Sequence, residues 1–306
     1  GILTSIENLR NASFEELYIS SINNIKPFIK YGTTTLEAKS GYGLSLKDEI
    51  KSLRVIKKIN DNLDIDILPT FLGAHAIPPE YNSNDYVDII CNEMLPQINN
   101  EQLAIFCDVF CEEGYFDIDQ SRKILNVAKS YNLIPKIHAD EFQYFGASKL
   151  AKEIGAASAD HLMHINMEGI DALSSSNVIA TLLPGTTFFL NKKEYANGRK
   201  LIDQNCQVSI ASDFNPGTCT IRSLPNIMFL AMKNCGMTLD EVFLGVTYNA
   251  AKSLLKENEL GLIKENYIAD IVFWDLDSLS EIPYWFDSGY SKINRVIKRG
   301  KEIINN

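Results

Sequence analysis

The sequence predicts an α/β fold, a (β/α)₈ barrel in which one βα unit is missing. Short β-rich runs alternate with amphipathic helices at intervals of about 25–35 residues, the spacing of successive βα units. The runs are apolar on both faces, which is typical of parallel strands covered by helices. Seven such repeats favour a barrel short of one unit over an open sheet.

Each expected element has its own signal. The expected strands are TTTLEAK (33–39), IDILPTFL (65–72), IFCDVFC (105–111), LIPKIHA (133–139), ASADHL (157–162), VIATLLP (178–184) and VSIASD (208–213). Apolar residues at three- and four-residue spacing mark the helices between them. One stripe is Ile50, Leu53, Ile56 and Ile59, and another is Ile124, Ala128 and Tyr131.

The pattern changes near the C-terminus. A capping box, T-L-D-E, predicts a helix from Thr238 to about Leu255, with Glu241 reaching back to the Thr238 backbone. Beyond it, residues 261–275 and 293–304 are predicted to be hairpin strands without helices. We therefore expect a barrel domain over residues 1–257, incomplete at its N-terminus, and a small β appendage over residues 258–306.

Composition excludes several classes of protein. The chain has 306 residues, 45% of them hydrophobic, with a net charge of −10 and no basic block, which argues against a nucleic-acid or anionic-membrane partner. No apolar run approaches the roughly 20 residues that cross a bilayer. The first residues lack a signal-peptide pattern. Six scattered cysteines predict reduced thiols in a cytoplasmic protein, although Cys107 and Cys111 have the spacing of a metal pair.

Polar residues follow several of the predicted strands where a packed core would not select them. In a barrel, these carboxyl ends converge on one mouth, so residues far apart in the sequence become neighbours. The residues are Tyr42, His75, Glu112, Glu113, His138, His161 and Asp213.

Each of these residues also has a structural explanation. A strand-end histidine is more often hydrogen-bonded than catalytic, and Asp213 before Phe-Asn-Pro-Gly can cap a turn. Glu112 and Glu113 are expected to be a solvated loop pair. Lys39 could be a modified bridging ligand, but an ion pair is favoured, and His164 is expected to be a loop residue. The coincidence of three histidines, one Asp and one Glu at five strand ends favours function.

Metal-assisted hydrolysis suits such a set. Neutral imidazoles and carboxylates hold a divalent ion, which polarises a carbonyl and acidifies water. A nearby Glu or Asp can move protons, and a histidine can stabilise a developing oxyanion. A catalytic metal usually has three protein ligands. Only His138 and Asp213 are well placed as ligands, and no H-x-H or H-E-x-x-H pair occurs.

Seven motifs spread over nearly the whole chain resemble one family, the imidazolonepropionases of the amidohydrolase superfamily. They are GTTTLEAKSGYGL, PTFLGAHAIPPEY, DVFCEEGYF, KIHADE, ASADHL, ASDFNPGT and EIPYWF. The segment 261–275 resembles the return of such enzymes to a small β-sandwich domain. Asn266 stands there where the pattern usually has Gly, an exchange that the left-handed region tolerates.

The resemblance implies hydrolytic opening of the ring of 4-imidazolone-5-propanoate to N-formimidoyl-L-glutamate in histidine degradation, with zinc or iron. His138 and Asp213 match the family's third and fourth metal ligands. Glu141 matches the residue beside the substrate and water, and His161 the histidine that assists at the carbonyl, so Glu141, His161 and Asp213 are the expected catalytic residues. The expected substrate contacts are Tyr42, His75, Glu141, Asn215, Gly217 and Thr218.

The chain also departs from the family pattern. The family's H-x-H pair lies on a first barrel strand, and the sequence begins after that strand. An upstream arginine that would hold the substrate carboxylate is absent for the same reason. We therefore expect a fragment that binds metal weakly and is inactive by itself. Homodimerisation is a further expectation at family level. Two alternatives are another cyclic-amide hydrolase or deaminase of the superfamily, and a non-catalytic barrel remnant that binds a small acid or a partner subunit.

Overall fold

Seven parallel strands form one sheet in sequential order, β1 to β7, as the sequence predicted. The computed structural model describes residues 2–286 and 292–305. The strands are β1 (Thr35–Lys39), β2 (Asp66–Ala74), β3 (Phe106–Cys111), β4 (Ile134–Ala139), β5 (Ser158–His161), β6 (Ile179–Leu182) and β7 (Val208–Ile210). Among the described residues, no pairing joins β1 to β7, so the sheet does not close there.

The sheet is strongly curled. Four strand spacings separate β1 from β5, which would be about 19 Å in a flat sheet. Lys39 on β1 nevertheless reaches Asp160 on β5, with 2.8 Å between Nζ and Oδ2, and Asp108 on β3, at 2.6 Å. Side chains from alternate strands share a layer in this way inside a closed barrel. The fold is therefore a curled (β/α) barrel sheet of seven parallel strands, without a pairing between β1 and β7 among the described residues.

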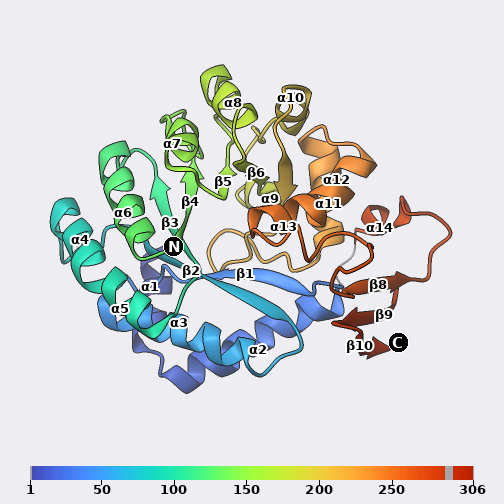
Figure 1. Ribbon diagram of the computed structural model, residues 1–306, viewed down its shortest axis with the longest axis horizontal. Coiled ribbons are helices and arrows are strands. Elements are labelled where there is room, and N and C mark those ends of the chain that lie inside the picture. Colours follow the sequence, from blue (N-terminus) through green and yellow to red (C-terminus); the bar gives the residue numbers. More distant parts are fainter. Residues whose placement is uncertain (1, 287–291, 306) are drawn as a thin grey trace.

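Helices cover the outer side of this curl, as the arc of coiled ribbons in Figure 1 shows. They are α1 (Ile2–Asn11), α2 (Phe14–Lys30), α3 (Leu46–Asn60), α4 (Ser83–Ile89), α5 (Leu95–Glu101), α6 (Ile118–Ser130), α7 (Ala147–Ile154), α8 (Met167–Ser174), α9 (Pro184–Phe189), α10 (Gly198–Asp203), α11 (Leu224–Asn234), α12 (Leu239–Val246) and α13 (Tyr248–Ser253). A π-helical turn, Ile90–Met94, joins α4 to α5.

The main core lies between the helices and the outer face of the strands. In α3 the predicted stripe is confirmed, because Ile50, Leu53 and Ile59 are buried and Ile56 packs partly against them. Every residue of β3, β5 and β6 is buried, as expected of parallel strands that are covered on both faces.

The predicted helix from Thr238 to Leu255 is two helices. The capping box at Thr238 is confirmed, but the backbone leaves helical geometry at Thr247, at φ −118° and ψ −92°. The Thr247 hydroxyl donates to the Phe243 carbonyl, a local bond that competes with the helical ladder. The prediction of one continuous helix was wrong at this residue.

A second sheet of three antiparallel strands forms the appendage. Its strands are β8 (Ile271–Trp274), β9 (Ile293–Lys298) and β10 (Lys301–Asn305), in the order β10-β9-β8. The short helix α14 (Glu281–Tyr284), which was not predicted, lies between β8 and β9, outside the two segments that were predicted to form strands. Asn266 adopts φ 68°, as the Gly-to-Asn exchange predicted.

The appendage is fixed to the start of the barrel sheet. Lys298 is buried, and its ammonium lies 2.7 Å from Asp66, the first residue of β2, and 2.5 Å from Asp270. Figure 1 places these red strands beside the end of α2. The appendage therefore lies beside the β2 start of the barrel sheet.

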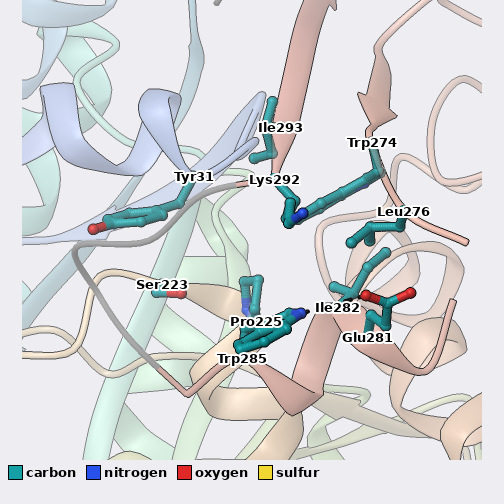
Figure 2. Close-up of a pocket in the computed structure, with 10 residues that line it drawn as sticks. All are labelled: Tyr31, Ser223, Pro225, Trp274, Leu276, Glu281, Ile282, Trp285, Lys292 and Ile293. Carbon is teal, nitrogen blue, oxygen red and sulfur yellow. Dashed lines mark hydrogen bonds between the residues drawn. The ribbon is translucent and has the colours of Figure 1, made fainter. Parts of the chain in front are cut away.

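A small cavity lies where the appendage meets the barrel. Its volume is about 20 Å³, and Figure 2 shows its lining drawn from Tyr31 after α2, Ser223 before α11, and Trp274, Trp285 and Ile293 of the appendage. Such a volume holds about one water molecule. The cavity is too small for a substrate and lacks the strand-end histidines. Among the described residues, no helix is long and apolar enough to cross a membrane.

Candidate active site

Three of the strand-end histidines lie together at the carboxyl ends of β2, β4 and β5. The ring centroids of His75 and His138 are 6.1 Å apart, and those of His138 and His161 are 5.2 Å apart. Tyr42, from the loop after β1, meets His75 edge-on at 5.1 Å. The predicted convergence of these residues on one mouth is therefore present in the structure.

His75 is held in one tautomer. Its Nδ1 lies 2.9 Å from the carbonyl oxygen of Gly41, and because a carbonyl only accepts, Nδ1 carries the proton. Burial, together with a smaller effect of the nearby His138, lowers the pKa of His75 to about 4. At neutral pH His75 is thus an uncharged ring whose Nε2 can accept a hydrogen bond.

His138 is buried beside a carboxylate. Its Nδ1 lies 3.0 Å from Oδ2 of Asp108, a contact of ionic length that is not aligned as a hydrogen bond. Burial lowers the pKa of His138, but Asp108 and Asp160 together outweigh burial, so the net shift is upward. A carboxylate on one ring nitrogen is the usual partner of a metal-binding histidine, because it orients the other nitrogen toward the ion.

A buried charge network lies beneath the histidines. Asp108, His138 and Asp160 have ligand atoms within 4.8 Å of one another, which is the spacing of a metal site. The Lys39 ammonium already lies between the two carboxylates. Lys39 thus neutralises the two carboxylates, and we assign Asp108 and Asp160 a supporting role instead of a ligand role. The ion-pair interpretation of Lys39 is confirmed.

The network continues deeper into the curl. Lys136 is 1% exposed, and its ammonium lies 2.9 Å from Glu37 and 4.9 Å from the centre of the Phe106 ring. Burial raises the pKa of Asp160, but Lys39 and Lys136 outweigh that effect and lower it to about 2. Charged side chains thus fill an interior that most barrels fill with apolar ones.

Glu141 is poised for proton transfer. It follows β4 and is buried, with its Oε2 3.6 Å from Nε2 of His161. Burial raises its pKa to about 7, opposed by the charges of His138 and Lys192. A carboxyl group with a pKa near neutrality is suited to general acid–base catalysis.

Glu112 holds the Glu141 loop in place. Its carboxylate accepts backbone N–H bonds from Glu141 at 2.9 Å and from Phe142 at 3.0 Å. The expectation of a solvated pair is wrong for Glu112, which is 1% exposed, and right for its exposed neighbour Glu113. The two backbone donors explain the difference, because they satisfy a carboxylate that burial would otherwise penalise.

The strand ends carry backbone strain. His161 has a φ of 81° and Asp213 a φ of 50°, values that residues other than glycine rarely adopt. Such residues gather at functional sites, where the surrounding structure enforces them. Burial lowers the pKa of His161 to about 4, and Asp213 opposes that shift, so the two groups interact across the mouth.

Asp213 joins the β7 end to the other side of the site. The Thr186 hydroxyl of α9 donates to its carboxylate. Burial raises the pKa of Tyr42, and the charge of Asp213 raises it further. Tyr42, His161 and Asp213 therefore share one electrostatic environment.

The remaining predicted substrate contacts form a closed loop. The Asn215 amide oxygen accepts from Gly217 N at 2.9 Å and Thr218 N at 2.7 Å. Its amide nitrogen donates to the Asp213 carbonyl at 2.8 Å. The structure thus brings Asn215, Gly217 and Thr218 together beside Asp213, with much of their hydrogen-bonding capacity used within the loop.

Sequence reasoning overlooked three residues of the site, namely Asp108, Lys136 and Asp160, and it named Glu112 only as a solvated residue. Each lies within a quoted motif, and Asp108, Lys136 and Asp160 interrupt apolar strands at inward-facing positions. A charged residue in the middle of a fully buried strand was the available signal, because burial of an unpaired charge is costly. Cys107 and Cys111 are buried free thiols, and the group of possible metal ligands among the described residues does not include them.

His138 and Asp213 carry donor atoms of the kinds that a divalent ion takes. His138 has Asp108 beside its Nδ1, which leaves Nε2 as the donor, and Asp213 has a half-buried carboxylate that influences His161. Nitrogen and oxygen donors of this kind suit zinc and iron.

Comparison with known proteins agrees with this site. Residues 116–303 match the model of the amidohydrolase family. A curated imidazolonepropionase of Thermoanaerobacter pseudethanolicus is 44% identical over 300 residues, which are 97% of this chain and 72% of that protein. The imidazolonepropionase of Brevibacillus brevis is 43% identical over 306 residues, covering 99% of this chain and 72% of its own length.

Solved structures support the same architecture. Escherichia coli guanine deaminase superposes with a TM-score of 0.75 at 14% identity, over 98% of this chain and 77% of the deaminase. Identity that low shows the fold alone. The sequence relationship is much closer, and it decides the family: the chain belongs to the amidohydrolases and, within them, to the imidazolonepropionase family.

Proposed function

We propose that the protein opens the ring of 4-imidazolone-5-propanoate by metal-dependent hydrolysis, giving N-formimidoyl-L-glutamate in histidine degradation. The observation that carries the proposal is the group of His75, His138 and His161 around Glu141, whose pKa burial raises to about 7. The relatives named imidazolonepropionase support the choice of substrate.

Glu141 is the proposed general base. At neutral pH about half of it is ionised, so it can take a proton from water and return it to the ring nitrogen that leaves. Glu112 fixes its position through the backbone, and His161 lies within 3.6 Å of it.

His161 and Asp213 are the other proposed catalytic residues. With a pKa of about 4, His161 is a neutral imidazole at physiological pH and can donate a hydrogen bond to the carbonyl oxygen as negative charge develops there. Asp213 lies close enough to influence His161 and can accept a proton as well as bind a cation.

His138 and Asp213 are the proposed metal ligands. A divalent ion bound there would polarise the ring carbonyl and make a water molecule more acidic. Its identity as zinc or iron is a prediction. Two protein ligands are fewer than a catalytic metal usually has, so the prediction of weak binding by this chain stands as well.

Substrate contacts are proposed for Tyr42, His75 and the Asn215–Thr218 loop. Tyr42 and His75 form one wall of the mouth, and a planar ring can pack against such aromatic faces. The cytoplasmic location and a homodimer remain predictions.

Ring opening should be measured on the full-length product of the gene, supplied with zinc or ferrous iron. We expect loss of the imidazolone absorbance, with Asp213→Ala removing most turnover. Glu141→Gln should lower turnover while the metal content stays the same. Near-normal turnover in Asp213→Ala would reduce that residue to a turn cap, and lost metal in Glu141→Gln would make Glu141 a ligand.

The competing activities are tested in the same assay. Hydantoin, dihydroorotate and guanine replace the imidazolone substrate, and faster turnover of any of them would favour another cyclic-amide hydrolase or a deaminase. Turnover of none would favour a non-catalytic barrel.

A further inference from the structure

The loop that carries Tyr42 is fixed by an unusual amount of bonding. The Glu49 carboxylate, 0% exposed at the start of α3, accepts backbone N–H bonds from Gly41 at 3.0 Å, Gly43 at 2.8 Å and Leu44 at 2.9 Å. A Cβ on Gly43 would lie 2.6 Å from the backbone of Asp48. The loop therefore packs directly on the first turn of the helix.

Arg10, at the end of α1, holds the same loop from the outside. Its Nε donates to the Gly43 carbonyl at 2.8 Å, and its Nη2 donates to the Leu44 carbonyl at 3.1 Å. Its Nη1 forms an ion pair with Glu80. One guanidinium thus binds two loops at once, since Glu80 belongs to the segment that follows His75.

Arg10 is itself anchored by α3. The Lys51 ammonium lies 2.9 Å from the Leu9 carbonyl, 3.3 Å from the Arg10 carbonyl and 2.9 Å from the Ala12 carbonyl, and it pairs with Asp48 at 2.9 Å. A cation on the last carbonyls of a helix satisfies groups that the helix leaves unpaired. The position of the guanidinium is therefore built into the fold.

The two loops that Arg10 joins meet at the mouth. Tyr42 packs edge-on against His75, and the Nδ1 of His75 donates to the carbonyl of Gly41, next to Tyr42. Movement of either loop would break that bond and change both the tautomer and the position of His75. A planar guanidinium that makes several bonds at once suits this joining task better than a lysine.

We propose that Arg10 is a positioning residue, a clamp that holds the Tyr42 loop and the His75 loop in register as one substrate-binding wall. The expected effect of Arg10 on KM rests on the proposed function. The expected effect on the loop structure rests on geometry alone. Arg10 does not touch the reacting atoms. It acts through Gly43, Leu44 and Glu80.

The structural arm uses hydrogen exchange on this chain. Arg10→Met should speed exchange of the amides of residues 41–44 by about tenfold, because the carbonyl bonds that steady the loop are lost. Arg54→Met is the matched control. Arg54 donates two hydrogen bonds to the Glu101 carboxylate, and its replacement should leave the exchange rates of the residue 41–44 amides unchanged. Equal exchange in wild type and Arg10→Met would overturn the proposal.

A second variant covers the case in which Arg10→Met fails to fold. Glu80→Gln keeps the backbone contacts of Arg10 and removes only the ionic link to the His75 loop. Exchange in residues 75–81 should rise while residues 41–44 stay protected. No change in residues 75–81 would show that the two loops are not coupled through Arg10.

The kinetic arm uses the full-length product. Arg10→Met should raise KM about tenfold and change kcat much less, because a displaced wall weakens substrate binding more than proton transfer. Arg10→Lys should recover part of this loss. An unchanged KM would overturn the clamp as a substrate-positioning device. If wild type turns over no substrate, the proposed function fails, while the exchange results still decide the clamp.

Discussion

Lys39→Met tests the buried charge network most sharply. The Lys39 ammonium lies 2.6 Å from Asp108 and 2.8 Å from Asp160, whose side chains are 0% and 6% exposed. Methionine has a similar length but no charge, so the substitution leaves two carboxylates facing each other in the interior. Breaking a buried pair by removing one partner usually costs about 3–5 kcal/mol.

The pKa of Asp160 gives an independent magnitude. Its lowering from 3.8 to about 2, chiefly by Lys39 and Lys136 against burial, corresponds to about 2 kcal/mol of stabilisation of the ionised form. The pKa of Asp108 is lowered too, by His138 and Lys39 against burial. Since both carboxylates lose the same ammonium, we expect a loss of about 3 kcal/mol in the free energy of unfolding at pH 7.

The pH dependence follows from the direction of these shifts. A carboxylate whose folded pKa is lowered contributes stability above its unfolded pKa, and that contribution is lost as the pH falls toward the folded value. The gap between wild type and Lys39→Met should therefore be full at pH 7 and shrink below about pH 4.

Urea unfolding at several pH values measures this gap. Lys149→Met is the matched control. Because both partners of its pair with Glu168 are exposed, its loss should leave the free energy of unfolding nearly unchanged. A loss below about 1 kcal/mol in Lys39→Met at pH 7, or a gap independent of pH, would refute the assignment of Lys39 as the neutralising cation.

Four further outcomes are expected. Asp108→Asn should weaken zinc binding to this chain about 10- to 100-fold in a calorimetric titration, because Asp108 orients His138; unchanged affinity would remove that role. Glu141→Gln should stabilise the chain by about 3 kcal/mol at pH 8 and by under about 1 kcal/mol at pH 5, because the raised pKa of Glu141 makes its ionised form unfavourable in the folded protein. If the variant and the wild type had the same urea midpoint at both pH values, this expectation would be contradicted. Gly43→Ala should lower the melting temperature far more than Gly217→Ala, because a Cβ on Gly43 would lie 2.6 Å from the Asp48 backbone and one on Gly217 would meet only the Asn215 amide oxygen at 3.5 Å; equal melting temperatures would contradict it. Thr238→Ala should cost about 1 kcal/mol in urea unfolding through loss of its capping box, and no loss would mean that the cap is dispensable.

The fold could be predicted because its signals are local. Apolar runs such as those at β3 and β4 are buried on both faces, and stripes such as Ile50, Leu53 and Ile59 mark covering helices. The break at Thr247 was missed because the apolar spacing continues through it, while a single backbone angle and a hydroxyl bond decide the break. The helix α14 was missed because it has only four residues, one of them Pro283, too few to show helical periodicity.

The candidate site could be predicted only in part. His75, His138 and His161 stand out because each is a titratable residue at the end of an apolar strand. The contact between Lys39 and Asp108 could not be predicted from the sequence, because it joins residues 69 positions apart and depends on the curl of the sheet. Glu112 was misread for the same reason, because its partners are backbone amides of a loop 29 and 30 residues later.

Zinc titration of the chain, beside its His138→Ala and His164→Ala variants, tests the central claim most directly. We predict that the chain binds one zinc ion with a Kd above about 1 μM, because it offers two proposed protein ligands instead of the usual three. Zinc binding should disappear in His138→Ala and persist in His164→Ala. His164 is a half-buried loop residue, and its Nδ1 lies 3.7 Å from the Glu194 carboxylate. Equal zinc binding in wild type and His138→Ala would contradict a metal-dependent hydrolase site at this mouth.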